Sequence, residues 1–290
     1  MSSNKAFPSK VILIGEYVVT LDSPALAVPF FGKSGAWTSV NGYKDESLTG
    51  FAAFLASSEA ATWLNVPAFR RDIDHGLRFT TSIPEGYGLG SSGALVAAVY
   101  DQYAAVKSMD LDELKTKFSV MESFFHGKSS GIDPLVSYLR EPLLSDNSSG
   151  VQTIKMPHLF DIQIFLIDSF QRRNTDACVQ RFREKKASSP IFNEVLESLS
   201  EQNRLAIDAF LQHDGVSLWK YLKEISRIQF HHFQEFIPPG HETIWENSLL
   251  REDFVIKLCG AGGGGYSLGF TKNMAVAMPE ISKFAPLWMS

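Results

Sequence analysis

The sequence predicts an α+β fold in which strands and helices come in separate groups. Apolar runs typical of strands cluster near the beginning of the chain and again in its second half, with long helical segments between them. A doubly wound parallel sheet would instead alternate single strands with single helices. With 290 residues, of which 44% are hydrophobic, the chain is long enough to bury a core in one large domain or two closely packed ones.

The first half mixes strands and helices. The apolar run at 9–14 is typical of a buried strand that ends at Gly15, and its partner follows a turn. The remaining expected elements are strands at 24–30, 36–41 and 77–83, and helices at 48–59, 92–107 and 110–125.

A loop is expected at residues 141–150, where proline, aspartate, asparagine, two serines and glycine accumulate. We place a domain boundary there, which gives an amino-terminal domain of residues 1–150 and a carboxy-terminal domain of residues 151–290. The expected elements of the second half are strands at 151–155 and 161–168, helices at 175–187 and 190–234, and a final pair of strands joined by a glycine loop.

Composition limits the classes of partner. A net charge of −5 argues against a broad nucleic-acid surface but leaves room for a local site for a phosphorylated ligand. Only Cys178 and Cys259 are present, so we expect buried thiols in a reducing compartment and no disulfide framework. No apolar run approaches a signal sequence or a membrane span. We therefore expect a cytoplasmic protein with a small-molecule substrate, without nucleic-acid or membrane partners, and we allow for a homodimer.

The strongest single motif is GYGLGSSGA at residues 86–94, which places small residues before a helix. The first N–H groups of a helix lack internal partners and carry partial positive charge, so a loop without bulky side chains lets a phosphate approach. The motif predicts a phosphate-binding loop formed by Gly88, Leu89, Gly90, Ser91, Ser92 and Gly93.

A dinucleotide-binding loop is the alternative for this motif. Gly88, Gly90 and Gly93 have the spacing G-x-G-x-x-G, and Asp110 follows at a suitable distance. However, Pro84 interrupts the approach from the preceding strand, and Asp110 opens a capped helix where a second parallel strand is needed. The lysine-bearing P-loop pattern is absent.

A second glycine cluster lies at residues 257–270, in KLCGAGGGGYSLGF. Consecutive glycines cost backbone entropy on folding, which favours a loop that packs tightly against the phosphate-binding loop or the ligand. A flexible turn between two strands is the alternative.

Three charged residues have the properties of a reaction site. Glu122 falls about 20° from Leu111 on a helical wheel and so points to the interior, where it needs Mg²⁺ or a buried cation as its partner. Asp133 before Pro134 either caps a helix or accepts the proton of a substrate hydroxyl. Lys10 on the first strand is either a solvated strand-end lysine or the partner that keeps Asp133 ionised.

Together these blocks resemble the GHMP superfamily of small-molecule kinases, which includes galactokinase, homoserine kinase, mevalonate kinase and phosphomevalonate kinase. The three motifs are PSKVILIGEYVV (8–19), PEGYGLGSSGA (84–94) and KLCGAGGGGYSLGF (257–270). ESFFHGKSSGID (122–133) and DSFQRRNTDACV (168–179) are most similar to the mevalonate kinases.

The resemblance implies a ribosomal-protein-S5-like amino-terminal domain, a ferredoxin-like carboxy-terminal domain, and ATP and Mg²⁺ as cofactors. It implies the following roles: Ser92 and Glu122 as Mg²⁺ ligands, Asp133 and Lys10 at the reacting groups, Gly262 and Gly263 beside the nucleotide, and Glu16, Arg173 and Thr175 at the substrate. Mevalonate kinases usually have His where this chain has Tyr17, and Ala where it has Gly93.

These patterns predict an ATP-dependent kinase that phosphorylates a hydroxyl of a small carboxylate-bearing metabolite, with mevalonate as the first candidate. Phosphomevalonate or another sugar or polyol is the rival acceptor, and it would require extra cations near Arg172, Arg173 and Lys128. A protein that keeps the fold and binds ligand without turnover is the alternative outside the enzymes, and a transfer assay separates the two classes.

Overall fold

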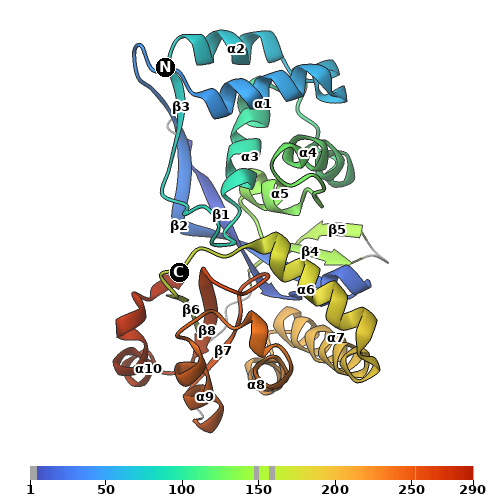
Figure 1. Ribbon diagram of the computed structural model, residues 1–290, viewed down its shortest axis with the longest axis vertical. Coiled ribbons are helices and arrows are strands. Elements are labelled where there is room, and N and C mark those ends of the chain that lie inside the picture. Colours follow the sequence, from blue (N-terminus) through green and yellow to red (C-terminus); the bar gives the residue numbers. More distant parts are fainter. Residues whose placement is uncertain (1–4, 147–149, 157–160, 252, 290) are drawn as a thin grey trace.

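The computed structural model describes residues 5–146, 150–156, 161–251 and 253–289, and the strands in these residues form two sheets. One sheet belongs to the amino-terminal half of the chain and the other to the carboxy-terminal half (Figure 1). Every strand pair described in the two sheets is antiparallel, which agrees with an α+β fold and not with a doubly wound one.

The first sheet is built around one long strand. Its members are β1 (Phe7–Ile14), β2 (Ala25–Ser39), β3 (Leu77–Thr81), β4 (Leu143–Asp146) and β5 (Gly150–Thr153). Strand β2 pairs with β1, β3 and β4, and β5 continues the sheet beyond β4. The strand predicted at 36–41 is therefore the end of β2, which is 15 residues long.

Helices cover one face of the first sheet. They are α1 (Glu46–Ser57), α2 (Val66–Asp74), α3 (Ser91–Tyr103), α4 (Leu111–His126) and α5 (Ile132–Leu139). Helices α3 and α5 pack on β1 and β2, and α4 packs on both of these helices (Figure 1). The phosphate-binding loop predicted before α3 therefore lies next to the first strand of the sheet.

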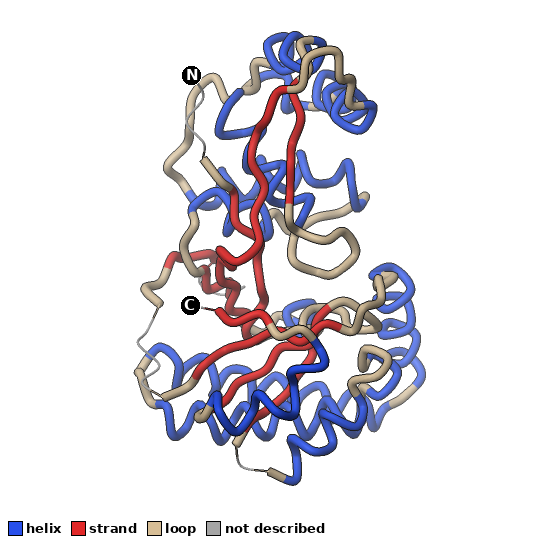
Figure 2. Tube along the Cα trace, turned by 90° about the vertical axis from the view of Figure 1, so that its left-hand side faces the viewer, coloured by secondary structure: helices blue, strands red, loops and turns tan. Residues whose placement is uncertain are grey.

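The second sheet has the strand order β7-β8-β6-β9. Its strands are β6 (Gln163–Asp168), β7 (Phe254–Leu258), β8 (Tyr266–Thr271) and β9 (Leu287–Met289), and the helices of this half are α6 (Thr175–Ser188), α7 (Pro190–Leu211), α8 (Gly215–His232), α9 (Glu242–Leu250) and α10 (Met274–Ile281). Helices of this half line the face of the sheet that is turned away from the first half (Figure 2). None of the helices in the described chain combines the length and the apolar character needed to cross a membrane.

Short 3-10 turns complete the chain: η1 (Val18–Leu21), η2 (Glu59–Thr62), η3 (Gln234–Phe236) and η4 (Ser282–Phe284).

Two further predicted elements differ from the structure. The loop predicted at 141–150 contains β4 and the first residue of β5, because Leu143 and Leu144 are buried against β2; residues 147–149 of that prediction lie outside the described residues. The helix predicted at 190–234 is two helices, since Asp214 caps a new one by accepting from the backbone N–H groups of Val216 and Ser217.

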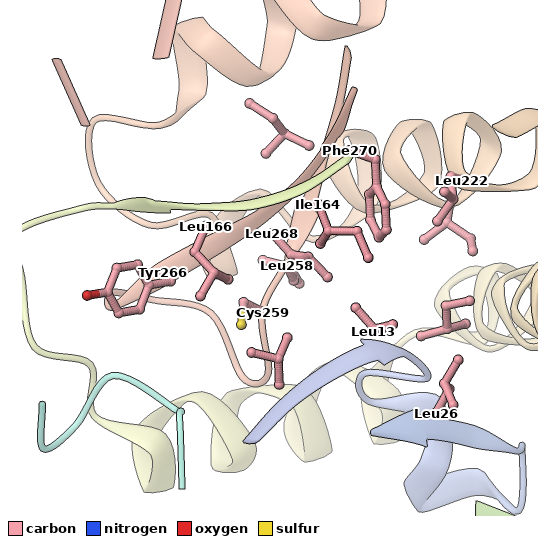
Figure 3. Close-up of a cluster of buried hydrophobic side chains, with 14 of the residues drawn as sticks. Leu13, Leu26, Ile164, Leu166, Leu222, Leu258, Cys259, Tyr266, Leu268 and Phe270 are labelled. Carbon is pink, nitrogen blue, oxygen red and sulfur yellow. The ribbon is translucent and has the colours of Figure 1, made fainter. Parts of the chain in front are cut away.

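The two halves share one hydrophobic core. Leu13 on β1 and Leu26 on β2 belong to the same buried cluster as Ile164 on β6 and Leu258 and Leu268 on β7 and β8. Figure 3 shows these side chains gathered between the strands of the two sheets. Burial of this shared apolar surface holds the first half against the second and so fixes the shape of any site between them.

Candidate active site

A pocket of about 730 Å³ lies between the start of α3, the loop that joins α4 to α5, and helix α6. Its lining residues are Gly86, Gly88, Gly90, Ser91, Ser92, Glu122, His126, Gly127, Lys128, Ser129, Ser130, Asp133, Arg173, Thr175, Asp176, Val179, Gln180 and Arg183. Predicted site residues from both halves of the chain therefore meet in one cavity. A larger cavity of about 920 Å³ along α8 is lined by none of them.

The start of α3 has the features of an anion site. Gly90 is the residue before the helix and has a φ of +71°, a left-handed conformation that glycine adopts without steric cost. No side chain caps α3, whereas Asp110 caps α4 and Asn174 caps α6. The first N–H groups of α3 are thus left for a ligand on the pocket side, as the motif predicts.

Glu122 on α4 lies under the start of α3 and is only 4% exposed. The Ser92 hydroxyl donates to Glu122 Oε1 at 3.1 Å, and the Ser129 hydroxyl donates to Oε2 in a short hydrogen bond. His126 Nε2 lies 3.0 Å from the Ser92 oxygen. The two serines and the histidine thus hold the carboxylate in a fixed orientation beside the pocket.

The surroundings of Glu122 fit a divalent cation. Burial raises the pKa of its carboxyl to about 7, and the negative charge of Asp133 adds to this increase. Among the described residues, Glu122 has no salt bridge with lysine or arginine, so the predicted alternative of a structural ion pair is not found. A hydroxyl and a carboxylate are the hard oxygen ligands that Mg²⁺ takes in company with substrate phosphates.

No group of three or more His, Cys, Asp or Glu side chains in the described chain could hold a metal ion on its own. A cation at Ser92 and Glu122 would therefore take its other ligands from phosphate oxygens and water.

The predicted pairing of Lys10 with Asp133 is present. Lys10 Nζ lies 2.7 Å from Asp133 Oδ1, and the lysine side chain is only 6% exposed. The Lys10 backbone N–H also donates to the Leu89 carbonyl at 2.8 Å, which ties β1 to the phosphate-binding loop. Asp133 lies in the first turn of α5 and lines the pocket together with Glu122.

Gly93 determines how closely Asp133 can approach α3. A Cβ at residue 93 would lie 2.8 Å from the backbone carbonyl carbon of Asp133 and 2.9 Å from Pro134 N. Atoms do not pack at such distances, so only glycine permits the observed contact between the two helix starts.

Arg173 lies between the two glycine loops. Its Nε donates to Thr175 Oγ1 at 3.1 Å, and Nη1 donates to the Cys259 carbonyl at 3.1 Å. The guanidinium passes so close to Gly88 and Gly260 that a Cβ at either position would lie within 2.7 Å of it. The structure thus brings Arg173 and Thr175 to the pocket beside the phosphate-binding loop, as predicted.

The second glycine cluster packs against the first, but none of its glycines at residues 260–265 is in the pocket wall. Gly265 approaches the backbone of Tyr87, which agrees with the predicted tight packing. Gly262 and Gly263, predicted beside the nucleotide, instead face the Phe236 carbonyl and Cys178 Sγ, respectively. The Gly263 N–H donates to that carbonyl at 2.7 Å. These two glycines therefore serve the packing of the loop on η3 and α6.

Glu16 also lies elsewhere than predicted. Its side chain is completely buried and forms a short salt bridge with Lys257, so its carboxylate does not face the pocket as a substrate ligand would. Burial raises the pKa of Glu16, and the charge of Lys257 opposes this effect. Tyr17 is likewise turned away, since its hydroxyl donates to the Ala261 carbonyl at 2.6 Å.

Several residues of the pocket wall are not among those predicted from the sequence. His126 comes four residues after Glu122 on the same helix, so it extends the same face by one turn. Asp176, Val179, Gln180 and Arg183 follow the i, i+3, i+4, i+7 pattern on α6 and mark the face turned to the pocket. That pattern was available in the sequence, although it does not say what the face contacts.

Part of the amino-terminal half is similar to a known family of domains. Residues 55–141 match the model of the GHMP kinases N terminal domain. The mevalonate kinase of Thermococcus onnurineus is 28% identical over 158 residues, or 45% of this chain and 47% of that protein. The mevalonate kinase of Archaeoglobus fulgidus is 29% identical over 219 residues, or 72% of this chain and 68% of that protein. The alignment thus spans about half the length of the Thermococcus relative.

Solved structures match the fold over nearly the whole chain. The L. major mevalonate kinase in complex with R-mevalonate has a TM-score of 0.69 at 14% identity, covering 98% of this chain and 91% of that one. The Streptococcus pneumoniae phosphomevalonate kinase has a TM-score of 0.69 at 16% identity, covering 100% and 98%. At such low identities the likeness concerns the fold, and it confirms the fold expected from the motifs.

Proposed function

We propose that this chain is a small-molecule kinase of the GHMP type, and that it transfers the γ-phosphoryl group of ATP to a hydroxyl of a small carboxylate-bearing metabolite, with mevalonate as the acceptor. One observation supports this proposal above the others. A single pocket is lined by an uncapped helix start, a buried carboxylate that has no cationic partner in the described part of the chain, a lysine-paired aspartate and an arginine. Phosphoryl transfer is catalysed mainly by groups that hold the nucleotide phosphates, neutralise their charge and orient the acceptor.

The nucleotide phosphates belong at the start of α3 in this proposal. The backbone N–H groups after Gly90 point toward the pocket end of the helix, and the small residues at 88–93 leave room for phosphate oxygens. Mg²⁺ held by Ser92 and Glu122 would neutralise charge on those oxygens when it is bound. The chain's own contribution here is to fix the two ligand oxygens in advance through Ser129 and His126.

Asp133 acts on the acceptor hydroxyl. Lys10 Nζ lies 2.7 Å from Asp133 Oδ1 and orients the carboxylate, so its other oxygen accepts the hydroxyl proton while the new oxygen–phosphorus bond forms. The bond between the γ-phosphorus and the bridging oxygen breaks at the same time, and ADP leaves with that electron pair. Asp133 thereby orients the hydroxyl in line with the bond that breaks.

Arg173 and Thr175 hold the other end of the acceptor. A guanidinium presents a fork that suits a carboxylate, and Arg173 is already oriented by its bonds to Thr175 and to the Cys259 carbonyl. Pre-orientation of this kind reduces the entropy lost on binding.

An acceptor screen with ATP and Mg²⁺ tests the proposal. We expect wild type to form ADP and phosphorylated product with mevalonate, Asp133→Asn to lose kcat, and Arg173→Ala to raise the acceptor KM. ADP formation without phosphorylated acceptor, or equal activity of Asp133→Asn, would contradict it.

One observation favours a second candidate acceptor that already carries a phosphate, such as phosphomevalonate. Lys128 and Arg183 line the pocket in addition to Arg173, and within the described residues neither side chain has an ion-pair partner. Two further cations suit a second anionic group on the acceptor. The KM values for mevalonate and phosphomevalonate, measured with wild type and with Arg183→Gln, distinguish the two candidate acceptors. Only a phosphorylated acceptor should bind more weakly to the variant.

A further inference from the structure

A fully buried ion pair joins the two halves of the molecule outside the pocket. Lys257 on β7 and Glu16 in the turn after β1 are 241 residues apart in sequence, and both side chains are 0% exposed. Removing two charges from water costs several kcal/mol per ion in typical cases, about as much as their attraction returns. A gain in stability is therefore a weak explanation for the presence of this pair. The contacts that connect the pair to the pocket offer a better explanation.

The first connection runs from Lys257 to Arg173. The Lys257 ammonium also donates to the Leu258 carbonyl at 2.9 Å. The next carbonyl along the chain, that of Cys259, accepts from Arg173 Nη1 at 3.1 Å. Two neighbouring carbonyls are thus held by two cations, so the position of the Arg173 guanidinium depends on the backbone that Lys257 fixes. In Figure 3, Cys259 lies between strands of the two halves.

Tyr17, next to Glu16, makes a second link to the same backbone. Its hydroxyl donates to the Ala261 carbonyl at 2.6 Å, and its ring stacks on Phe182 with the centroids 4.5 Å apart. Tyr17 has a φ of +64°, a conformation that costs free energy for a bulky side chain. The surrounding contacts must offset that cost, which indicates that the turn at residues 15–17 is held in one conformation.

The other end of this turn is β1, the strand that carries Lys10. Lys10 pairs with Asp133 at 2.7 Å, and Glu16 follows two residues after β1 ends at Ile14. The Glu16–Lys257 pair therefore connects the strand that supports Asp133 with the backbone that supports Arg173.

We propose that Glu16 and Lys257 form a positioning pair that sets the Arg173 guanidinium relative to Asp133 across the pocket, and so controls affinity for the anionic end of the acceptor. The pair contacts neither substrate in this account and acts through the carbonyls of Leu258 and Cys259. The inference rests on the proposed function for its kinetic consequence, whereas the effect on Arg173 itself is independent of activity.

The test is a double variant, Glu16→Leu/Lys257→Met, which removes both charges and keeps similar volumes. Replacing a buried ion pair by apolar residues of similar size is often neutral for stability, so we expect a thermal midpoint close to that of wild type. We expect the acceptor KM to rise about tenfold, the change that corresponds to one lost hydrogen bond to a charged group. The KM for ATP and kcat should change much less.

Two further variants keep the test interpretable. Tyr17→Phe removes only the hydroxyl that holds Ala261 and should raise the acceptor KM by a smaller factor in the same direction, even if the double variant folds poorly. Arg251→Met/Glu280→Leu is the matched control, since this pair is joined at 2.6 Å outside the pocket wall. The control should leave every kinetic constant unchanged.

NMR spectra report how firmly the Arg173 guanidinium is held, without any need for turnover. The Arg173 Nε–H signal is assigned as the one that is lost in Arg173→Lys. We expect a slowly exchanging signal in wild type and in the control, and a broadened or lost signal in the double variant. A double variant with wild-type thermal midpoint, wild-type acceptor KM and an unchanged Arg173 signal would overturn the inference. Absence of transfer by wild type would instead overturn the proposed function, and the Arg173 signal would still decide whether the pair positions the guanidinium.

Discussion

Gly93→Ala is the substitution for which the structure gives the sharpest expectation. The new methyl group would lie 2.8 Å from the Asp133 carbonyl carbon and 2.9 Å from both Asp133 Cβ and Pro134 N. Ordinary contacts begin at 3.4 Å, so the start of α5 must retreat by about 0.6 Å. The atoms in the way belong to backbone or lie next to it, so no flexible side-chain end can absorb the change.

That retreat moves Asp133 away from the acceptor hydroxyl. A misplacement of about 1 Å at a reacting group costs about 100-fold in rate, so a shift of this size should lower kcat by between about tenfold and 100-fold. The free energy of unfolding should fall by between zero and about 2 kcal/mol, because alanine gains about 1 kcal/mol over glycine in a helix while overpacking costs about 1–3 kcal/mol.

The assay is steady-state kinetics at saturating ATP and acceptor, together with the thermal midpoint. Gly50→Ala on α1 is the matched control, since a Cβ there meets only Phe124 Cζ at the ordinary distance of 3.7 Å. We expect this control to be as stable as wild type or more stable, with unchanged kcat. If Gly93→Ala keeps kcat within twofold of wild type, the position of Asp133 does not limit the reaction and the reasoning fails.

Three further outcomes are expected. Asp133→Asn should lower kcat by about 10²- to 10⁴-fold with little change in acceptor KM, and undiminished turnover would remove its role. Arg173→Ala should raise the acceptor KM by about tenfold or more, whereas a loss confined to kcat would point to another role. In metal-free protein, Glu122 has a folded pKa of about 7 against an ordinary 4.5, so its ionised form destabilises the fold above pH 7 and this penalty disappears as the pH falls. Glu122→Gln should therefore melt above wild type at pH 8, and the difference should shrink by pH 5.5; a constant difference would contradict the assignment.

The structural features of the pocket that the sequence predicts correctly are those encoded locally. The loop before α3 is a run of small residues next to a helical pattern, and its position fixes the start of that helix. Its binding of phosphate stays a prediction. Glu122 falls on the buried face of α4 by helical spacing alone, and the structure confirms its burial. The Lys10–Asp133 pair follows from a general rule that a buried cation needs an anion.

The residues that the sequence places wrongly are positioned by partners far away in the sequence. Glu16 is held away from the pocket by its salt bridge with Lys257. Gly262 packs against the Phe236 carbonyl, and Gly263 packs against the Cys178 thiol. Nothing near these residues in sequence indicates such partners. Likewise, the loop composition at 141–150 hides β4, because Leu143 and Leu144 pair with β2 more than a hundred residues earlier.

A structure of the protein with Mg²⁺, a non-hydrolysable ATP analogue and mevalonate would show whether the pocket brings phosphate, cation and acceptor together. We expect the γ-phosphate at the start of α3, the cation on Ser92 and Glu122, and the acceptor hydroxyl within hydrogen-bond distance of Asp133. A nucleotide bound in another cavity, such as the one along α8, or a γ-phosphate on the far side of α3 from Asp133, would contradict this expectation.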